Sequence, residues 1–200
     1  YQEYLVDELY AHPGNNRGLA GVAHDMARDN IIALFVSLGL TVSVEPFTYA
    51  GETWENVVAT KMGSLYPDRC FILGAHYDSS NNPGGDDDAS GVALVLEAAR
   101  ILSSYDSEYT IRFVAFDMAE QGLRGSQAYA TAHAGERILG MVSADMVAHD
   151  PNTNKSLVFG NPCSNVLKTA LGNAVTAYSG GLTGTLREDV VASSDHLSFQ

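Results

Sequence analysis

The sequence has 200 residues, of which 46% are hydrophobic, and a formal net charge of -13. This length and composition suit one domain with a sizeable core and are unlike those of a disordered chain. Acidic residues outnumber basic ones by 24 to 11, and no cluster of Lys and Arg occurs, which argues against a nucleic-acid or anionic-membrane partner. The longest apolar runs, such as residues 31–36, are far shorter than the roughly 20 residues of a membrane span.

The hydrophobic pattern predicts one domain over residues 1–200 in which helices and strands alternate. A helix is expected at residues 21–38, ending at Gly39, and a first strand at residues 40–47. Four short, almost continuously apolar segments are typical of strands buried on both faces, and they lie at residues 55–62, 69–76, 110–117 and 138–145. Further helices are expected at residues 89–104, around 125–134, and at 164–178. Such alternation favours a largely parallel α/β sheet.

The two cysteines, Cys70 and Cys163, have no C-x-x-C spacing, so neither a zinc ribbon nor a thioredoxin-like redox site is indicated. Cys70 lies in an apolar strand pattern, which favours a core position over a disulfide with Cys163. The chain begins at Tyr1 without an apolar leader, so we expect that any leader was removed or that the chain was trimmed.

Five potential metal ligands end or follow predicted strands or stand in the loops beyond them, where ligands of α/β sheets gather. They are His76, Asp87, Glu120, Asp145 and His196. Two imidazoles with three carboxylates suit a divalent ion such as Zn²⁺. A carboxylate can bridge two ions about 3.5–4 Å apart, and Asp87 is best placed for this. The alternative for the acidic run at residues 86–88 is helix capping, in which Asp88 can serve.

Asp78 follows His76 by two residues and is a candidate to accept the second imidazole N–H, which would fix the histidine tautomer. A plain turn aspartate is the alternative. Asp195, directly before His196, is expected to cap or turn its loop. His12, His24 and His133 have helix-like or polar surroundings and are expected at the surface. His149 is close to Asp145, but its surroundings are typical of a turn-forming loop, so it is expected outside the site.

Several motifs, taken together and in order, resemble the zinc-dependent aminopeptidases of the M28 family, which carry two zinc ions. These motifs are "NVVATKMG", "GAHYDSS", "PGGDDDASG", "AEQGLRGSQAYA", "SADM" and "SSDH". Each motif is weak alone, but the set is specific, and the likeness extends from about residue 13 to the end.

The resemblance implies that His76 and Asp145 bind one zinc, that Glu120 and His196 bind the other, and that Asp87 bridges them. It also implies a mixed, mainly parallel sheet of about eight strands flanked by helices. In the family a metal-bound hydroxide attacks the first peptide bond of a peptide or protein whose free amino terminus lies near the metals. This resemblance predicts a zinc metallo-aminopeptidase that is a monomer and is secreted or periplasmic.

The sequence departs from the family at Ala119, where the family has a glutamate that acts as general base before the zinc-binding one. A methyl group cannot move a proton, a function typically worth about 10²–10⁴ in rate, so we expect little or no activity. Asp117 is a poor substitute, because two residues along an extended strand span some 6–7 Å. The alanine was either introduced to trap an inactive complex or belongs to a natural non-catalytic relative.

Family members continue beyond the position of Gln200 with a strand and a helix, so we expect a chain shortened at its C-terminus.

Two other functions remain open. One is a single-zinc enzyme related to glutaminyl cyclases, against which the second histidine and carboxylate argue. The other is a non-catalytic module that binds metal or peptide, which Ala119 favours. An α/β domain with an acidic loop and no metal is the least specific alternative.

Overall fold

The computed structural model describes residues 16–18, 20–148, 155–159, 164–187 and 194–199. The chain divides into two compact units, one formed by Tyr1–Met146 with Ser194–Gln200 and the other by Val147–Ser193. The first unit contains all five candidate metal ligands.

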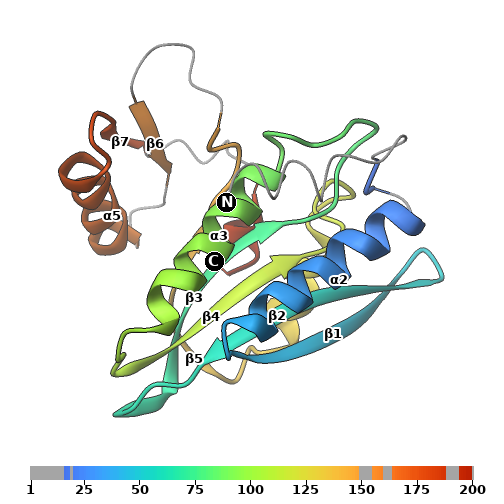
Figure 1. The fold of residues 1–200 in the computed structure, drawn as a ribbon, viewed down its shortest axis with the longest axis horizontal. Helices are drawn as coiled ribbons and strands as arrows, with labels where there is room; N and C mark the ends of the chain where they lie inside the picture. Colours follow the sequence, from blue (N-terminus) through green and yellow to red (C-terminus); the bar gives the residue numbers. More distant parts are fainter. Residues whose placement is uncertain (1–15, 19, 149–154, 160–163, 188–193, 200) are drawn as a thin grey trace. The chain divides into compact units, whose positions relative to one another are not determined.

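The larger unit is built on a five-stranded sheet with the order β1-β2-β4-β3-β5 (Figure 1). Its strands are β1 (Thr41–Tyr49), β2 (Glu52–Lys61), β3 (Tyr66–His76), β4 (Tyr109–Phe116) and β5 (Arg137–Ser143). The β1–β2 and β2–β4 pairs are antiparallel, whereas β3 is parallel to both β4 and β5. All five strands expected from the sequence up to residue 145 are confirmed.

The sheet is mixed, as expected, but the expectation of a mainly parallel sheet is wrong for the described residues, since only two of the four pairings are parallel. One of the two antiparallel pairings, β1–β2, follows from the connection between these strands, where Ala50 and Gly51 both have positive φ angles, of 54° and 85°. A two-residue turn of this kind reverses the chain and pairs its flanking strands antiparallel. The sheet has five strands in the described part of the chain, not about eight.

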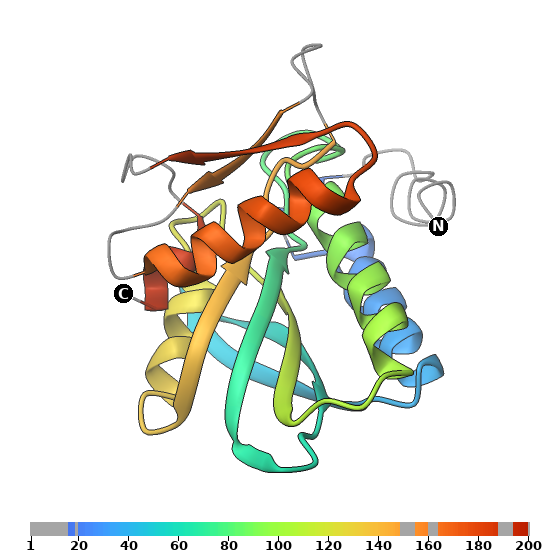
Figure 2. The same ribbon diagram turned by 90° about the vertical axis from the view of Figure 1, so that its left-hand side faces the viewer.

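Helices cover both faces of this sheet (Figures 1 and 2). On one face, α2 (Val22–Ser37) and α3 (Ala89–Ser103) pack against a core that includes Val57 and Phe113. On the other, α4 (Arg124–Ala132) and the short 3₁₀ helix η2 (Asp195–Phe199) pack against Val58, Val114 and Phe116 through Tyr129 and Phe199. Neighbouring strand residues point to opposite faces, which explains why these apolar runs are continuous.

The second unit holds the parallel strands β6 (Lys155–Phe159) and β7 (Thr183–Arg187) and the helix α5 (Asn165–Tyr178). Helix and strand approach closely, because a Cβ atom built on Gly184 would lie 2.2 Å from the carbonyl oxygen of Gly172. The helices expected at residues 21–38, 89–104, 125–134 and 164–178 are all confirmed to within a few residues. Among the described helices, none has the length and apolarity required to cross a membrane.

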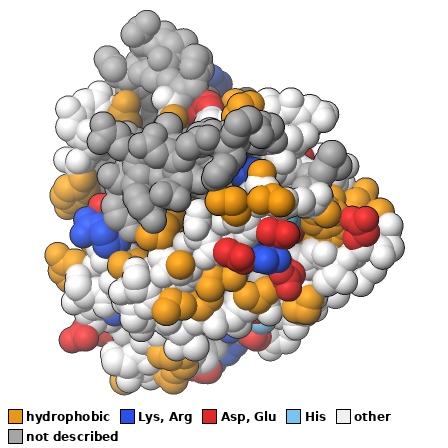
Figure 3. Space-filling model, turned by 45° about the vertical axis from the view of Figure 1, so that its right-hand side comes forward, with side chains coloured by type: hydrophobic (Ala, Val, Ile, Leu, Met, Phe, Trp, Pro, Cys, Tyr) orange, Lys and Arg blue, Asp and Glu red, His pale blue; other side chains and the backbone are white. Residues whose placement is uncertain are grey.

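Charged side chains are scattered on the face drawn in Figure 3, where basic groups lie beside acidic ones. Arg28, in the larger unit, is an example of such pairing: its guanidinium lies 2.6 Å from Glu55 and 2.9 Å from Asp29. Pairing of this kind offsets the positive charge of Arg28.

Candidate metal centre

The carboxyl ends of three neighbouring parallel strands meet at one edge of the five-stranded sheet. His76 is the last residue of β3 and pairs with Phe116, the last residue of β4. On the other side of β3, Gly74 pairs with Ser143, the last residue of β5. The segments that follow these strands therefore leave the sheet side by side, as parallel pairing requires.

Three of the predicted ligands come together at this edge. One ligand atom from each of His76, Asp87 and Asp145 lies within 4.8 Å of the others. His76 is 5% exposed, and its Nε2 atom is 3.1 Å from Asp87 Oδ1. Burial by itself would lower the pKa of His76, but its contacts with Asp78 and Asp87 raise that pKa well above the ordinary value. Burial raises the pKa of Asp145.

Glu120 and His196 lie near this group without joining it. Across the described residues, His76, Asp87 and Asp145 form the one set of three or more potential ligands that meets the 4.8 Å distance. Burial, followed by the charge of Asp87, raises the pKa of Glu120. Burial lowers the pKa of His196, and the charge of Asp145 opposes this. Both side chains thus interact electrostatically with members of the group.

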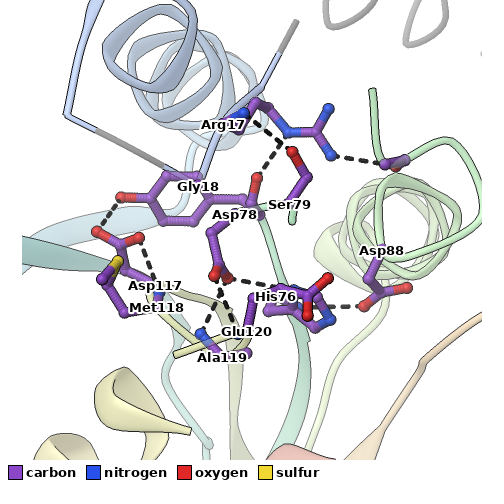
Figure 4. A network of polar contacts seen from close by, with 12 residues as sticks. Arg17, Gly18, His76, Asp78, Ser79, Asp88, Asp117, Met118, Ala119 and Glu120 are labelled. Atoms are coloured by element: carbon purple, nitrogen blue, oxygen red, sulfur yellow. Dashed lines mark hydrogen bonds and ion pairs between the residues drawn. The ribbon is translucent and has the colours of Figure 1, made fainter. Parts of the chain in front are cut away.

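Asp78 is fully buried and lies between His76 and the segment after β4 (Figure 4). Its Oδ1 is 3.2 Å from His76 Nδ1 and also accepts a hydrogen bond from the Ala119 N–H at 3.0 Å. The other oxygen, Oδ2, accepts from the Glu120 N–H at 3.1 Å. One carboxylate therefore joins the ring of one predicted ligand to the backbone of another. Its position is the one that an orienting contact to His76 requires.

Ala119 is 8% exposed. The carboxylate of Asp117, two residues earlier, is hydrogen-bonded to other groups. Asp117 Oδ1 is 2.8 Å from His24 Nε2 and accepts from the Met118 N–H, while Oδ2 accepts from the Tyr77 hydroxyl and the Glu55 N–H. Four donors surround its two oxygens in a fully buried position. This arrangement ties Asp117 to the scaffold beneath the site.

Asp88 caps α3, as the sequence suggested. Its Oδ1 accepts from the N–H groups of Gly91 and Met146, at 2.9 and 3.2 Å, and its Oδ2 accepts from the His76 N–H at 3.2 Å. Burial raises the pKa of Asp88 well above its ordinary value. One side chain thus joins the start of α3, the end of β3 and the segment after β5 (Figure 4 shows the contact with His76).

Two histidines differ from the surface positions expected for them. His24 is 4% exposed, because it shares the buried face of α2 with Ala27 and Ile31. Its spacing of three and seven residues from these apolar positions is the signal that could have placed it in the core. His133 is partly buried between Glu45 and Glu136. His12, His149 and Cys163 lie outside the described residues, whereas Cys70 is buried, as expected for a core position.

Two further charged residues are buried: Asp195, which was expected to cap or turn its loop, and Arg17, whose position the sequence did not predict. Asp195 begins η2 and is fully buried. Burial raises its pKa to about 6, and the nearby Ser126 hydroxyl opposes this rise. Arg17 is 1% exposed and contacts the loop after β3. A lone arginine in "NNRG" carries no periodic or motif signal, so nothing local predicts this contact.

Comparison with known proteins supports the motif resemblance. Residues 56–200 match the family described as Peptidase family M28. A protein of Pyrenophora teres f. teres called "Probable zinc metalloprotease" is 41% identical over 125 residues, which cover 53% of this chain and 27% of that protein. Aminopeptidase YwaD of Bacillus subtilis is 35% identical over 141 residues, which cover 69% of this chain and 30% of YwaD. The chain thus matches less than a third of either relative.

The fold has a counterpart among solved structures. The Legionella pneumophila LapA aminopeptidase superposes with a TM-score of 0.80 and 21% identity, covering all of this chain and 56% of that one. At this identity the likeness concerns the fold alone, and it agrees with a mixed sheet flanked by helices. The family match extends over most of the chain and includes all five residues of the predicted ligand set, so this chain belongs to peptidase family M28.

Proposed function

We propose that this chain carries the metal centre of a zinc-dependent aminopeptidase that acts on peptide or protein amino termini. The observation that carries the proposal is the meeting of His76, Asp87 and Asp145 within 4.8 Å at the carboxyl edge of the sheet. The names of two relatives, a zinc metalloprotease and an aminopeptidase, support the metal and the reaction.

The donor set suits zinc. Imidazole nitrogen and carboxylate oxygen are both ordinary zinc ligands, bound at about 2.0–2.2 Å, and three donors within 4.8 Å of one another need only small movements to share an ion. We assign His76 and Asp145 to one zinc, Glu120 and His196 to a second, and Asp87 to both. The electrostatic coupling of Glu120 to Asp87 and of His196 to Asp145 supports this wider set.

Zinc in such a centre supplies Lewis acidity and a water of lowered pKa. The side chains of the protein would hold and orient the metal ligands. Asp78 accepts from the His76 ring on the Nδ1 side and so leaves Nε2 directed toward Asp87. The same carboxylate holds the backbone of Glu120, so that it aligns the two predicted ligands together.

Proton transfer is the step that this chain lacks. Ala119 stands at the position of the general base, and its methyl group can neither accept a proton from a water nor deliver one to a leaving amine. Asp117 does not replace it in our proposal, because four donors already surround its oxygens. We therefore propose a metal-binding aminopeptidase scaffold with little or no turnover.

The experiment compares the chain with Ala119→Glu and with the matched control Ala119→Gln, which adds similar volume but accepts no proton. Zinc content is measured by elemental analysis, and turnover with an amino-acid arylamide. We expect two zinc ions per chain throughout, and a rate increase of about 10²–10⁴ in the glutamate variant alone. Absence of zinc would reject the metal centre. Equal rates in both variants, with zinc bound, would reject the assignment of the base position.

One observation favours a second candidate. The described residues hold a single group of three ligands within 4.8 Å, which suits a one-zinc enzyme of the glutaminyl-cyclase type. That enzyme would bind one zinc per chain and would cyclise glutaminyl peptides, which a discontinuous ammonia assay detects. The alanine at position 119 also favours a non-catalytic, peptide-binding relative. Such a protein would bind peptides tightly, and its Ala119→Glu variant would remain inactive.

A further inference from the structure

A ten-residue connection separates two of the proposed ligands, His76 at the end of β3 and Asp87 just before α3. Its first part, residues 77–84, is here called the 77–84 loop. Residues 16–18, which precede α2 in sequence, pack against this loop. They lie outside residues 56–200, over which the family match extends.

The Arg17 side chain donates hydrogen bonds to three carbonyl oxygens of the 77–84 loop. Its Nε bonds to Tyr77 O at 2.7 Å, Nη2 bonds to Gly84 O at 3.1 Å, and Nη1 bonds to Pro83 O. The Arg17 backbone N–H donates to Ser79 Oγ at 2.9 Å. Figure 4 shows Arg17 beside Ser79, with its guanidinium directed at the loop. Both ends of the loop are thus held by one side chain.

The packing around these bonds leaves no free space. A Cβ atom added to Gly18 would lie 1.9 Å from Ser79 O. A Cβ added to Gly84, whose φ is +61°, would lie 2.7 Å from Arg17 Nη2 and 2.6 Å from Asp87 O. Two glycines therefore permit the close approach on either side of Arg17. The 77–84 loop and residues 16–18 are therefore in close contact at both glycines.

The chemistry of the contact requires arginine. A planar guanidinium presents five donors at fixed angles, so it can satisfy several carbonyl oxygens at once and hold them in one geometry. Lysine offers a single rotating ammonium group. Tyr77 directly follows His76, and Gly84 stands three residues before Asp87, so the two anchored carbonyls determine how far apart the two proposed ligands lie.

We infer that Arg17 is a positioning residue, which holds the 77–84 loop in the form that brings Asp87 to 3.1 Å from His76 and thereby strengthens metal binding by this pair. The inference rests on the proposed metal centre. The inference gives a role in metal binding to residues 16–18, none of which is a proposed metal ligand.

The test measures zinc affinity by competition with a chromogenic chelator, using all 200 residues of this sequence. Arg17→Met keeps an unbranched apolar stem and removes the guanidinium donors, while Arg17→Lys keeps the charge. The matched control is Arg112→Met. Arg112 is a partly buried arginine of β4, but it pairs with Ile72, away from the carboxyl edge, and bonds to Tyr129 and Glu136.

We expect Arg17→Met to weaken zinc binding about 10- to 100-fold, which is the usual effect of losing a group that orients a metal ligand. The zinc affinity of Arg17→Lys should lie between those of Arg17→Met and the parent. Arg112→Met should lower the melting temperature but leave zinc affinity within about twofold of the parent. Hydrogen exchange of the metal-free proteins should become faster in the 77–84 loop only in the Arg17 variants.

Zinc binding by folded Arg17→Met within twofold of the parent would overturn the inference and leave the proposed function intact. Equal losses in Arg17→Met and Arg112→Met would also overturn it, because a general loss of stability would then explain both. If Arg17→Met does not fold, the same comparison is made with Arg17→Lys. A parent chain that binds no zinc would reject the proposed function and the inference with it.

Discussion

His24 Nε2 lies 2.8 Å from Asp117 Oδ1, and both side chains are almost completely removed from solvent. This contact joins the first turn of α2 to the segment that leaves β4 toward Ala119 and Glu120. Asp117 also accepts from the Tyr77 hydroxyl, which bonds in turn to Glu55 O. The segment with the proposed base position thus rests on a buried polar network from three parts of the chain.

Replacing His24 tests the strength of this network. His24→Phe keeps a ring but removes a donor from a buried carboxylate, so we expect a loss of about 1–3 kcal/mol in the free energy of unfolding. Chemical denaturation monitored by circular dichroism measures it. His133→Phe is the control, because His133 sits in a partly exposed ion pair and should cost less than about 1 kcal/mol. Equal losses would contradict the special position of His24.

Gly125 offers a steric test of the same region. A Cβ atom at Gly125 would lie 2.3 Å from both Asn56 Oδ1 and Asp117 O, so Gly125→Ala should push the segment after β4 out of place. Overpacking of this kind costs about 1–3 kcal/mol. Gly135→Ala is the matched control, because nothing lies within 4 Å of its added Cβ atom. If the Gly125→Ala protein is as stable as Gly135→Ala, the atoms around Gly125 can move to admit a methyl group at little cost.

Asp88 should be more important for stability than an ordinary helix cap. Asp88→Asn keeps the shape but places an amide group where at least one N–H donor points, so we expect a loss of about 1–3 kcal/mol in the free energy of unfolding. The melting temperature and denaturant midpoint measure this loss. Asp68→Asn, in an exposed pair with Arg137, should change stability by less than about 0.5 kcal/mol. Similar values for the two variants would count against the role of Asp88 as a joint between three segments.

Glu136 provides a pH test far from the metal centre. Burial would raise its pKa, but hydrogen bonds with Arg112 and His133 outweigh burial and lower it. A carboxyl whose folded pKa lies below the unfolded value of 4.5 stabilises the fold above that value, and this contribution is lost as pH falls through the folded pKa. Glu136→Gln should therefore be less stable than the parent near pH 7.

The difference between Glu136→Gln and the parent should narrow as the pH falls below the ordinary value for glutamate and vanish at lower pH. Urea midpoints measured from pH 7 to about pH 2.5 test this, with m-values compared to confirm two-state behaviour. Asp68→Asn serves as an exposed control, for which we expect little change across the same range. A difference that persists at the acid end would mean that the contribution is packing and not charge.

The sequence alone determined the local elements and the chemical nature of the candidate site. Apolar periods located the helices α2 and α3 and the strand that ends at His76, because side chains of one face must all meet the core. The acidic run before α3 predicted the cap at Asp88, since a helix start needs an acceptor within a few residues. These signals are local, and a sequence displays them directly.

Only the tertiary structure decided which distant groups meet. Arg17 contacts residues 60 or more positions along the chain, and His24 contacts Asp117 across 93 positions. The antiparallel pairing of β2 with β4, and the three donors around Asp78, likewise depend on how the sheet is ordered. The sequence around a single buried polar residue has no periodicity or motif from which its hydrogen-bond partner can be predicted. Its partner is chosen by the requirement that buried polar groups find hydrogen bonds once the whole chain has packed.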